Sequence, residues 1–408
     1  MAHQDQLSEW ITTVSTTFPH LSRPQARGLA LWSYGIVMTR SCGRTTVAAF
    51  LALLLGRKAA SLAQQLQEWL LPADKKAGAK RGIKRRSLEV TSCFAPLLAW
   101  VVRLAHPATL ALAVDASTLH DRFVLLVISV VYRGCAIPVA WTVVPAGQRG
   151  AWRTCWLRML RQLRAAVPAD LTVLVLADRG LYARWLFRRI VRLGWHPFLR
   201  VNRHTTFRPA GRARFYRLEE LVPLVGSRWQ GVGEAFKTRS ARLPCTLSAC
   251  WSVGYAEAWC VLTDLPPRAC EVTWYGLRSW CEQGFKVLKR GAWLWQHTRM
   301  RDPERVARLG LALAVATVWM LSVGSELDEL LCDTAVPNLY GMLHQSAHTP
   351  RQRQVRVVRL GLLWLLVSVL QGKRVPLPRR LICEPWPHAV PPAAGLVFLE
   401  DCQHRVSE

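Results

Sequence analysis

The order of apolar runs between residues 109 and 201 constrains the fold more than any other feature of the chain. Three runs rich in apolar and β-branched residues, LALAV, FVLLVISVVY and AIPVAWTVV, follow one another, which is typical of consecutive antiparallel strands. The amphipathic segment WRTCWLRMLRQLRAAV then precedes the buried-strand run LTVLVLA, and YARWLFRRIVRLG precedes PFLRV. The order β-β-β-α-β-α-β predicts a mixed α/β layer.

The segments on either side of this layer in the sequence differ from it in their residue patterns. Residues 1–105 have apolar residues at helical spacing and are predicted to be a helical, basic N-terminal region. Residues 202–267 carry short alternating runs and are predicted to be a β-rich insertion. Residues 326–408 are predicted to be a helical C-terminal region with a Pro-rich tail. The α/β core is therefore expected to comprise residues 106–201 and 268–325.

The charge balance points to a polyanionic partner. The chain has 54 Lys and Arg against 26 Asp and Glu, a formal net charge of +28, and Arg suits phosphate binding. Nucleic acid is the preferred interpretation over a solvated basic surface or an anionic membrane surface. The basic segment Lys75–Arg86 includes Lys84, Arg85 and Arg86, and it is either a solvated linker or a contact to the DNA backbone. The N-terminal region, residues 1–105, is accordingly predicted to bind DNA.

Cysteine usage and the apolar runs indicate a cytosolic protein. The 12 cysteines never form a CxxC pair, so we expect reduced thiols and no zinc site. The start MAHQDQLSEW lacks the pattern of a signal peptide. The longest apolar runs, Leu309–Val323 and Leu360–Leu370, are shorter than the roughly 18 to 20 residues of a membrane span. We therefore expect buried core helices and no membrane partner.

Two aspartates follow directly on apolar strand runs. Asp115 ends the run LALAV, and Asp178 ends the run LTVLVLA. One such aspartate would be explained as a turn or helix-capping residue. Two of them on strands predicted to be neighbours favour a shared cation, because a buried carboxylate destabilises the fold unless a partner compensates its charge.

Polar side chains recur along the segment Trp274–Gly291, WYGLRSWCEQGFKVLKRG. In an α-helix, with about 100° per residue, five of them would lie within an arc of about 80°. They are Tyr275, Arg278, Glu282, Lys286 and Lys289. A solvated face with a Glu282–Lys286 pair would explain the acid and the lysines, but it leaves the tyrosine and the arginine unexplained.

These blocks resemble those of a known enzyme family. The spacing of Tyr, Arg, Glu and Lys in YGLRSWCEQGFKVLK resembles the YREK signature of the insertion-sequence-four family of bacterial DDE transposases, which includes the Tn-five-type enzyme. AVDAS and LADRG resemble the blocks around that family's two aspartates. The resemblance implies a ribonuclease-H-like core, a mixed five-stranded sheet with flanking helices, that carries a β-rich insertion.

The resemblance also implies the catalytic acids and their cofactor. Asp115, Asp178 and Glu282 would be the metal-binding catalytic triad. The expected cofactor is a pair of Mg²⁺ ions, with Mn²⁺ as a substitute, because oxygen ligands suit Mg²⁺ and two ions can steady the attacking and leaving oxygens of an in-line displacement.

The remaining residues of the signature are implied to bind DNA. Three of them match positions that hold phosphates near the cut: Tyr275, Arg278 and Lys289. Lys286 occupies a further basic position found in some members of the family. Trp259, in AWCVLTDLP, resembles a tryptophan that stacks on a flipped base, although a core tryptophan explains it as well.

The function implied is cut-and-paste DNA transposition, with strand cleavage at the element ends and strand transfer into target DNA. The implied partners are terminal inverted repeats, target DNA and a second copy in a synaptic homodimer, in the nucleoid-associated cytoplasm. Two alternatives stay open: a ribonuclease-H-like nuclease selective for DNA structure, and a catalytically inactive DNA-binding relative. The insertion and the basic N-terminal region argue against the first, and the presence of all three acids argues against the second.

Overall fold

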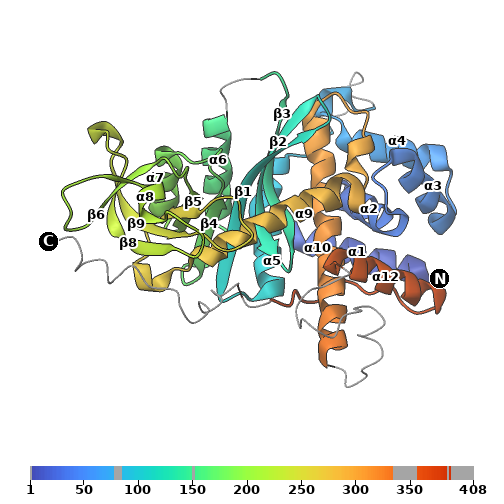
Figure 1. Ribbon diagram of the computed structural model, residues 1–408. Helices are drawn as coiled ribbons and strands as arrows, with labels where there is room; N and C mark the ends of the chain where they lie inside the picture. Colours follow the sequence, from blue (N-terminus) through green and yellow to red (C-terminus); the bar gives the residue numbers. More distant parts are fainter. Residues whose placement is uncertain (1, 78–84, 149–151, 334–355, 384–385, 387–408) are drawn as a thin grey trace. The chain divides into compact units, whose positions relative to one another are not determined.

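The computed structural model describes residues 2–77, 85–148, 152–333, 356–383 and 386 (Figure 1). The chain divides into two compact units. Unit 1 comprises residues 1–107, 116–169 and 280–384, and unit 2 comprises residues 108–115, 170–279 and 385–408. The architecture is mixed α/β, with a large sheet and flanking helices.

Unit 2 is built on parallel strands. Strand β1 (Thr109–Leu119), whose first residues belong to this unit, pairs in parallel with β4 (Thr172–Ala177), and β4 pairs in parallel with β5 (His196–Arg200). Helix α7 (Arg184–Arg192) connects β4 to β5. β4 has five consecutive buried residues, as expected for a parallel strand that is covered on both faces.

The sheet of unit 2 continues into the region predicted to be a β-rich insertion. β10 pairs antiparallel with β5, and the order continues β10-β9-β8-β6-β7. The bounds are β6 Thr206–Pro209, β7 Tyr216–Arg217, β8 Arg228–Ala235, β9 Leu243–Cys250 and β10 Trp259–Thr263, with the short helix α8 at Leu218–Leu221. These strands therefore extend the sheet that holds β4 and β5.

Unit 1 contains a long β-hairpin. β2 (Phe123–Tyr132) pairs antiparallel with β3 (Cys135–Pro145), and β2 lies next to β1 in the sheet. Arg133 and Gly134 form the turn with φ of 43° and 74°, because a two-residue hairpin loop favours positive φ at both positions. Both strands are almost entirely buried, so their alternating faces are both covered by protein.

Helices make up the rest of unit 1. α2 is buried along most of its length and contacts α1, α3, α4 and α10. Ser22 and Gln25 form a capping box at its start, and Gly56, at φ 61°, ends α3. The bounds are α1 Ala2–Thr17, α2 Arg23–Thr39, α3 Arg44–Leu55, α4 Ala59–Leu70, α5 Phe94–Ala105 and α6 Trp152–Arg164.

The longest helix of unit 1 is α10 (Pro303–Asp333), drawn in orange in Figure 1. Its segment Pro303–Leu331 is long and apolar enough to cross a membrane, so the prediction that the apolar run is too short is wrong about length. However, 94% of the apolar window is buried inside the protein, as in the core helix of a globular fold. Such a helix is weak evidence for a membrane span.

α10 packs against α12 (Val357–Leu370) at a glycine pair. A Cβ atom on Gly324 would overlap the carbonyl oxygen of Val357, and one on Gly361 would overlap that of Met320. The two backbones approach each other so closely that only glycine fits at the crossing.

Candidate active site

Asp115 and Asp178 occupy equivalent positions on neighbouring parallel strands. The register of β1 and β4 ends with Val114 opposite Ala177, and the two aspartates are the next residues of their chains. The prediction that their strands are neighbours is confirmed. The prediction that Asp115 ends its strand is wrong, because β1 continues to Leu119.

The guanidinium of Arg278 lies between the two carboxylates. Its Nη2 donates hydrogen bonds to Oδ1 of Asp115 at 3.0 Å and to Oδ2 of Asp178 at 3.1 Å. The side chains of Asp115 and Arg278 are only 11% and 16% exposed, while that of Asp178 is 33% exposed. Because one nitrogen contacts both oxygens, these oxygens are no more than about 6 Å apart.

The turn that follows β4 fixes the carboxylate of Asp178. Its Oδ1 accepts hydrogen bonds from the backbone N–H groups of Gly180 at 2.9 Å and Leu181 at 3.2 Å. This is the local side-chain-to-backbone pattern by which aspartate stabilises a turn. Oδ1 of Asp178 therefore serves the turn, and Oδ2 accepts from Arg278. The shared metal ion stays a prediction.

The segment that carries the signature is not a single α-helix, as the sequence predicted. It is a 3₁₀-helix, η6, over Val272–Ser279, an α-helix, α9, over Trp280–Lys286 and a π-helical turn, η7, over Val287–Gly291. A 3₁₀-helix has three residues per turn, so the arc of about 80° that was predicted for the five polar side chains of an α-helix does not describe this segment. Aromatic and β-branched residues with a glycine, in the sequence VTWYG, have low α-helix propensity. Single π-helical turns are frequent at functional sites.

Tyr275 is buried, with 5% of its surface exposed. Its ring makes an edge-to-face contact with the half-buried Trp259 at 5.3 Å, and the guanidinium of Arg200 lies 5.7 Å from the ring centroid. Burial raises the pKa of Tyr275. Its phenol is therefore protonated at neutral pH and can serve as a hydrogen-bond donor.

A carboxylate that sequence reasoning missed joins the neighbouring arginines. Glu257 accepts hydrogen bonds from Nη1 of Arg179 at 2.8 and 2.9 Å and from Nη2 of Arg200 at 2.8 Å. Arg179 directly follows Asp178, and Arg200 is the residue that contacts Tyr275. Two arginines, Arg179 next to Asp178 and Arg200 at the end of β5, were visible in the sequence and could have suggested a missing acidic partner. No sequence pattern identified Glu257 as that partner.

An open polar hollow of about 400 Å³ adjoins this group. Arg179 and Glu257 line it, together with residues of the loop after β5. The lining residues are Arg179, Asn202, Arg203, His204, Ala256 and Glu257. Since the lining is polar and partly cationic, a charged ligand group suits it better than an apolar one.

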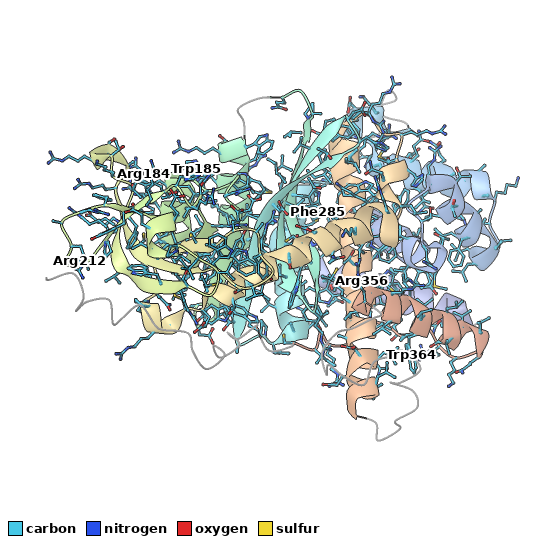
Figure 2. The ribbon with its side chains drawn as sticks, viewed as in Figure 1. Arg184, Trp185, Arg212, Phe285, Arg356 and Trp364 are labelled. Carbon is cyan, nitrogen blue, oxygen red and sulfur yellow. The ribbon has the colours of Figure 1, made fainter. Side chains whose placement is uncertain are left out.

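The other predicted site residues that the structure describes belong to unit 1. Glu282 is exposed in the first turn of α9, and Lys286 is exposed at its end. Lys289 donates to the hydroxyl of Ser117 at 2.6 Å, and its Nζ lies 5.5 Å from the ring of Phe285. Phe285 is labelled in Figure 2. Within the described residues no group of three or more His, Cys, Asp or Glu side chains is placed to hold a metal ion. The three-acid site therefore stays a prediction.

The basic segment of the N-terminal region is only partly described. Lys84 lies outside the described residues. Arg85 is exposed and forms an ion pair with Glu68, and Arg86 is exposed. An exposed ion pair of this kind contributes little to stability, so the interpretations of this segment as a linker or a DNA contact both stay open.

Comparison with known proteins adds one finding to this geometry. The family model for the transposase DDE domain matches residues 122–319. The match supports a transposase of the DDE type. It covers just under half of the chain, includes Asp178 and the signature segment, and begins after Asp115. No curated protein gives a significant match.

The residues present suit a divalent metal ion, which DDE transposases generally use. The two aspartates already hold one cation, the guanidinium of Arg278, between oxygens no more than about 6 Å apart. Carboxylate oxygens are the ligands that Mg²⁺ and Mn²⁺ prefer. Asp115 and Asp178 are therefore the residues of unit 2 that would hold the ion.

Proposed function

We propose that the protein is a cut-and-paste transposase of the insertion-sequence-four family. The observation that carries the proposal is the contact of Arg278, a residue of the YREK-like signature, with two aspartates on neighbouring parallel strands. A ribonuclease-H-like core is supported by the strand order β3-β2-β1-β4-β5, by the antiparallel pairing of β2 with β3 and by the parallel pairing of β1, β4 and β5.

In this function Asp115 and Asp178 would hold Mg²⁺ at the scissile phosphate, and Glu282 is proposed as the third acid of the catalytic triad. A divalent ion held there would supply the activation of water or a 3′-OH and would stabilise the charge that develops on the phosphate. The protein contributes position and electrostatics. Arg278 exchanges its contacts with the carboxylates for a contact with a DNA phosphate, since a guanidinium binds both kinds of anion. Lys286 and Lys289 add positive charge for the same strand.

Trp259 and Tyr275 form an aromatic pair next to this site. Trp259 is half-buried, so part of its ring is accessible for stacking. We assign Trp259 to stacking on a base displaced at the element end, where unstacking costs a few kcal/mol that aromatic stacking partly offsets. Tyr275 supports the indole ring from the side and donates its hydroxyl to the DNA backbone.

The partners of this function are terminal-repeat DNA, target DNA and a second copy of the chain in a synaptic complex. The family match supports DNA as the substrate, and the net charge of +28 suits a polyanion. A nucleoid-associated location in the cytoplasm goes with this substrate.

The test is a time course of nicked, end-processed and joined DNA with Mg²⁺ and the DNA that flanks the gene. Asp115→Asn and Asp178→Asn should abolish all products while DNA affinity is retained. Trp259→Ala should slow end processing and leave first-strand nicking near normal, whereas Arg278→Ala should impair both. The matched control is Glu234→Gln, which alters an Arg–Glu pair on β6 and β8 of the same unit.

Three results would contradict the proposal. Cleavage without any joined product would favour the structure-selective nuclease. Specific DNA binding by wild-type protein without metal-dependent cleavage would favour the inactive DNA-binding relative. Equal loss of both steps in Trp259→Ala, together with a lower melting temperature, would make Trp259 a core residue.

A further inference from the structure

Helix α7 presents a row of arginines that neither the family match nor the signature explains. Its sequence is RWLFRRIVR, which contains no acid. Arg184, Arg188 and Arg192 recur every four residues, so they lie within an arc of about 80° on one side of the helix. Figure 2 labels Arg184 and Trp185 in the first turn of this helix. These three residues are called the α7 arginine row below.

The packing of α7 fixes which way the row points. Leu186, Phe187 and Ile190 are buried on the opposite side of the helix. Arg188 and Arg192 are exposed, and Arg184 is half-buried, with one N–H donated to the carbonyl oxygen of Ser240. The row is therefore held outward by a helix that cannot rotate without exposing its apolar side.

Unlike most arginines of unit 2, the members of the row have no carboxylate partner among the described residues. Most arginines around it are neutralised by acids: Arg179 and Arg200 by Glu257, Arg208 by Glu234, Arg214 by Glu220, Arg217 by Glu219, and Arg228 by Glu271. Among the described residues, no member of the row forms an ion pair. Like charges one turn apart destabilise a helix slightly, so the row is not there to stabilise α7.

We propose that the α7 arginine row binds the phosphate backbone of the DNA strand that leaves the cleavage site. This inference rests on the proposed function, because it takes DNA as the substrate. α7 begins six residues after Asp178, in the same unit. From Arg184 to Arg192 the helix rises about 12 Å, which corresponds to three or four phosphates of one strand at about 3.4 Å each along the axis. The contacts position DNA without reading sequence.

The experiment compares two double variants that remove the same charge from unit 2. Arg188→Gln with Arg192→Gln removes unpaired arginines, and Arg214→Gln with Arg217→Gln removes exposed arginines that already have acidic partners. Affinity for a terminal-repeat duplex is measured by fluorescence anisotropy over a series of salt concentrations. Far-ultraviolet circular dichroism and melting curves confirm that each variant is folded.

The row variant should bind the duplex on the order of tenfold to a hundredfold more weakly near 0.1 M salt, and the slope of log affinity against log salt should fall by about 2. The paired-arginine variant should remain close to wild type. Replacement by Lys at both row positions should retain most of the slope, because the charge is kept. Single methylphosphonates placed along the strand should weaken wild-type binding at positions where they leave the row variant unaffected.

Equal losses in the two double variants would overturn the inference, since general charge would then explain the binding. An unchanged row variant, or one that loses affinity for anionic phosphatidylglycerol vesicles but not for DNA, would also overturn it. The outcome is separable from the proposed function. A wild-type protein that binds DNA through the row but cuts none would refute the transposase and leave the row in place.

Discussion

Arg278→Ala should change how the two aspartates respond to metal. Without the guanidinium, Asp115 and Asp178 face each other as two anions no more than about 6 Å apart. Their repulsion at that distance is about 3 kcal/mol at an effective dielectric constant of 20 and about 0.7 kcal/mol in water. Breaking a fully buried pair costs about 3 to 5 kcal/mol. Because the Asp178 side chain is 33% exposed, we expect a loss of about 2 kcal/mol.

Mg²⁺ should recover that loss in the variant and do little for the wild type in the absence of DNA, because Arg278 and a metal ion compete for the same carboxylates. If Arg278→Ala binds Mg²⁺ tenfold more tightly than the wild type does, saturating Mg²⁺ adds about 1.4 kcal/mol more to the stability of the variant. The assay is thermal melting with and without Mg²⁺, supported by calorimetric titration with Mn²⁺. Arg208→Ala is the matched control, since it breaks a half-buried Arg–Glu pair of unit 2.

The reasoning is refuted if Arg278→Ala melts like the wild type and gains no response to Mg²⁺. It is also refuted if Asp178→Asn, added to Arg278→Ala, fails to restore part of the stability, because that change removes one of the two repelling charges.

Three further outcomes are expected. Glu257→Gln should lower the cleavage rate about tenfold and leave stability nearly unchanged, because Arg179 and Arg200 lose their shared charged acceptor; cleavage kinetics and melting curves measure the two effects. Since burial raises the pKa of most of the described thiols, iodoacetamide at neutral pH should label the exposed Cys383 before the buried cysteines of the described residues, which should react only on unfolding; peptide mass spectrometry reads the labelling. Because the pKa of Tyr275 is raised in the folded state, its contribution to stability is complete below about pH 10 and is lost as pH rises beyond it. Urea unfolding should therefore show that the free energy of unfolding decreases less above about pH 10 in Tyr275→Phe than in the wild type.

The parts of the fold that follow from local pattern were predictable. The strands β2, β3 and β4 are continuous apolar runs, and such a run is stable only when both faces of the strand are buried away from water. The prediction that the strands carrying Asp115 and Asp178 are neighbours followed from the order of those runs. Pairing partners farther along the chain were not encoded locally, which is why β10 was assigned to an insertion and not to the sheet that contains β5.

The site was predictable in residue type and less so in geometry. The acids and Arg278 stand out in the sequence, but the bridge that Arg278 makes depends on the 3₁₀ pitch of η6, which a 100° wheel does not describe. The burial of Tyr275, in η6, depends on Trp259, a residue of strand β10. Tertiary contacts of this kind override helix periodicity, so one sequence alone could not supply them.

The close glycine contact between α10 and α12 is a position at which a conditional mutation of this protein can be designed. Because Gly324 and Gly361 let two backbones touch, a single added methyl group at either position acts as a wedge and its effect grows as the helices loosen on warming. Alanine at one of these positions should give a temperature-sensitive allele whose defect begins in unit 1, far in sequence from the aspartates. Such an allele would let the protein be inactivated in living cells by a small change in growth temperature, without altering any residue proposed to contact DNA or metal.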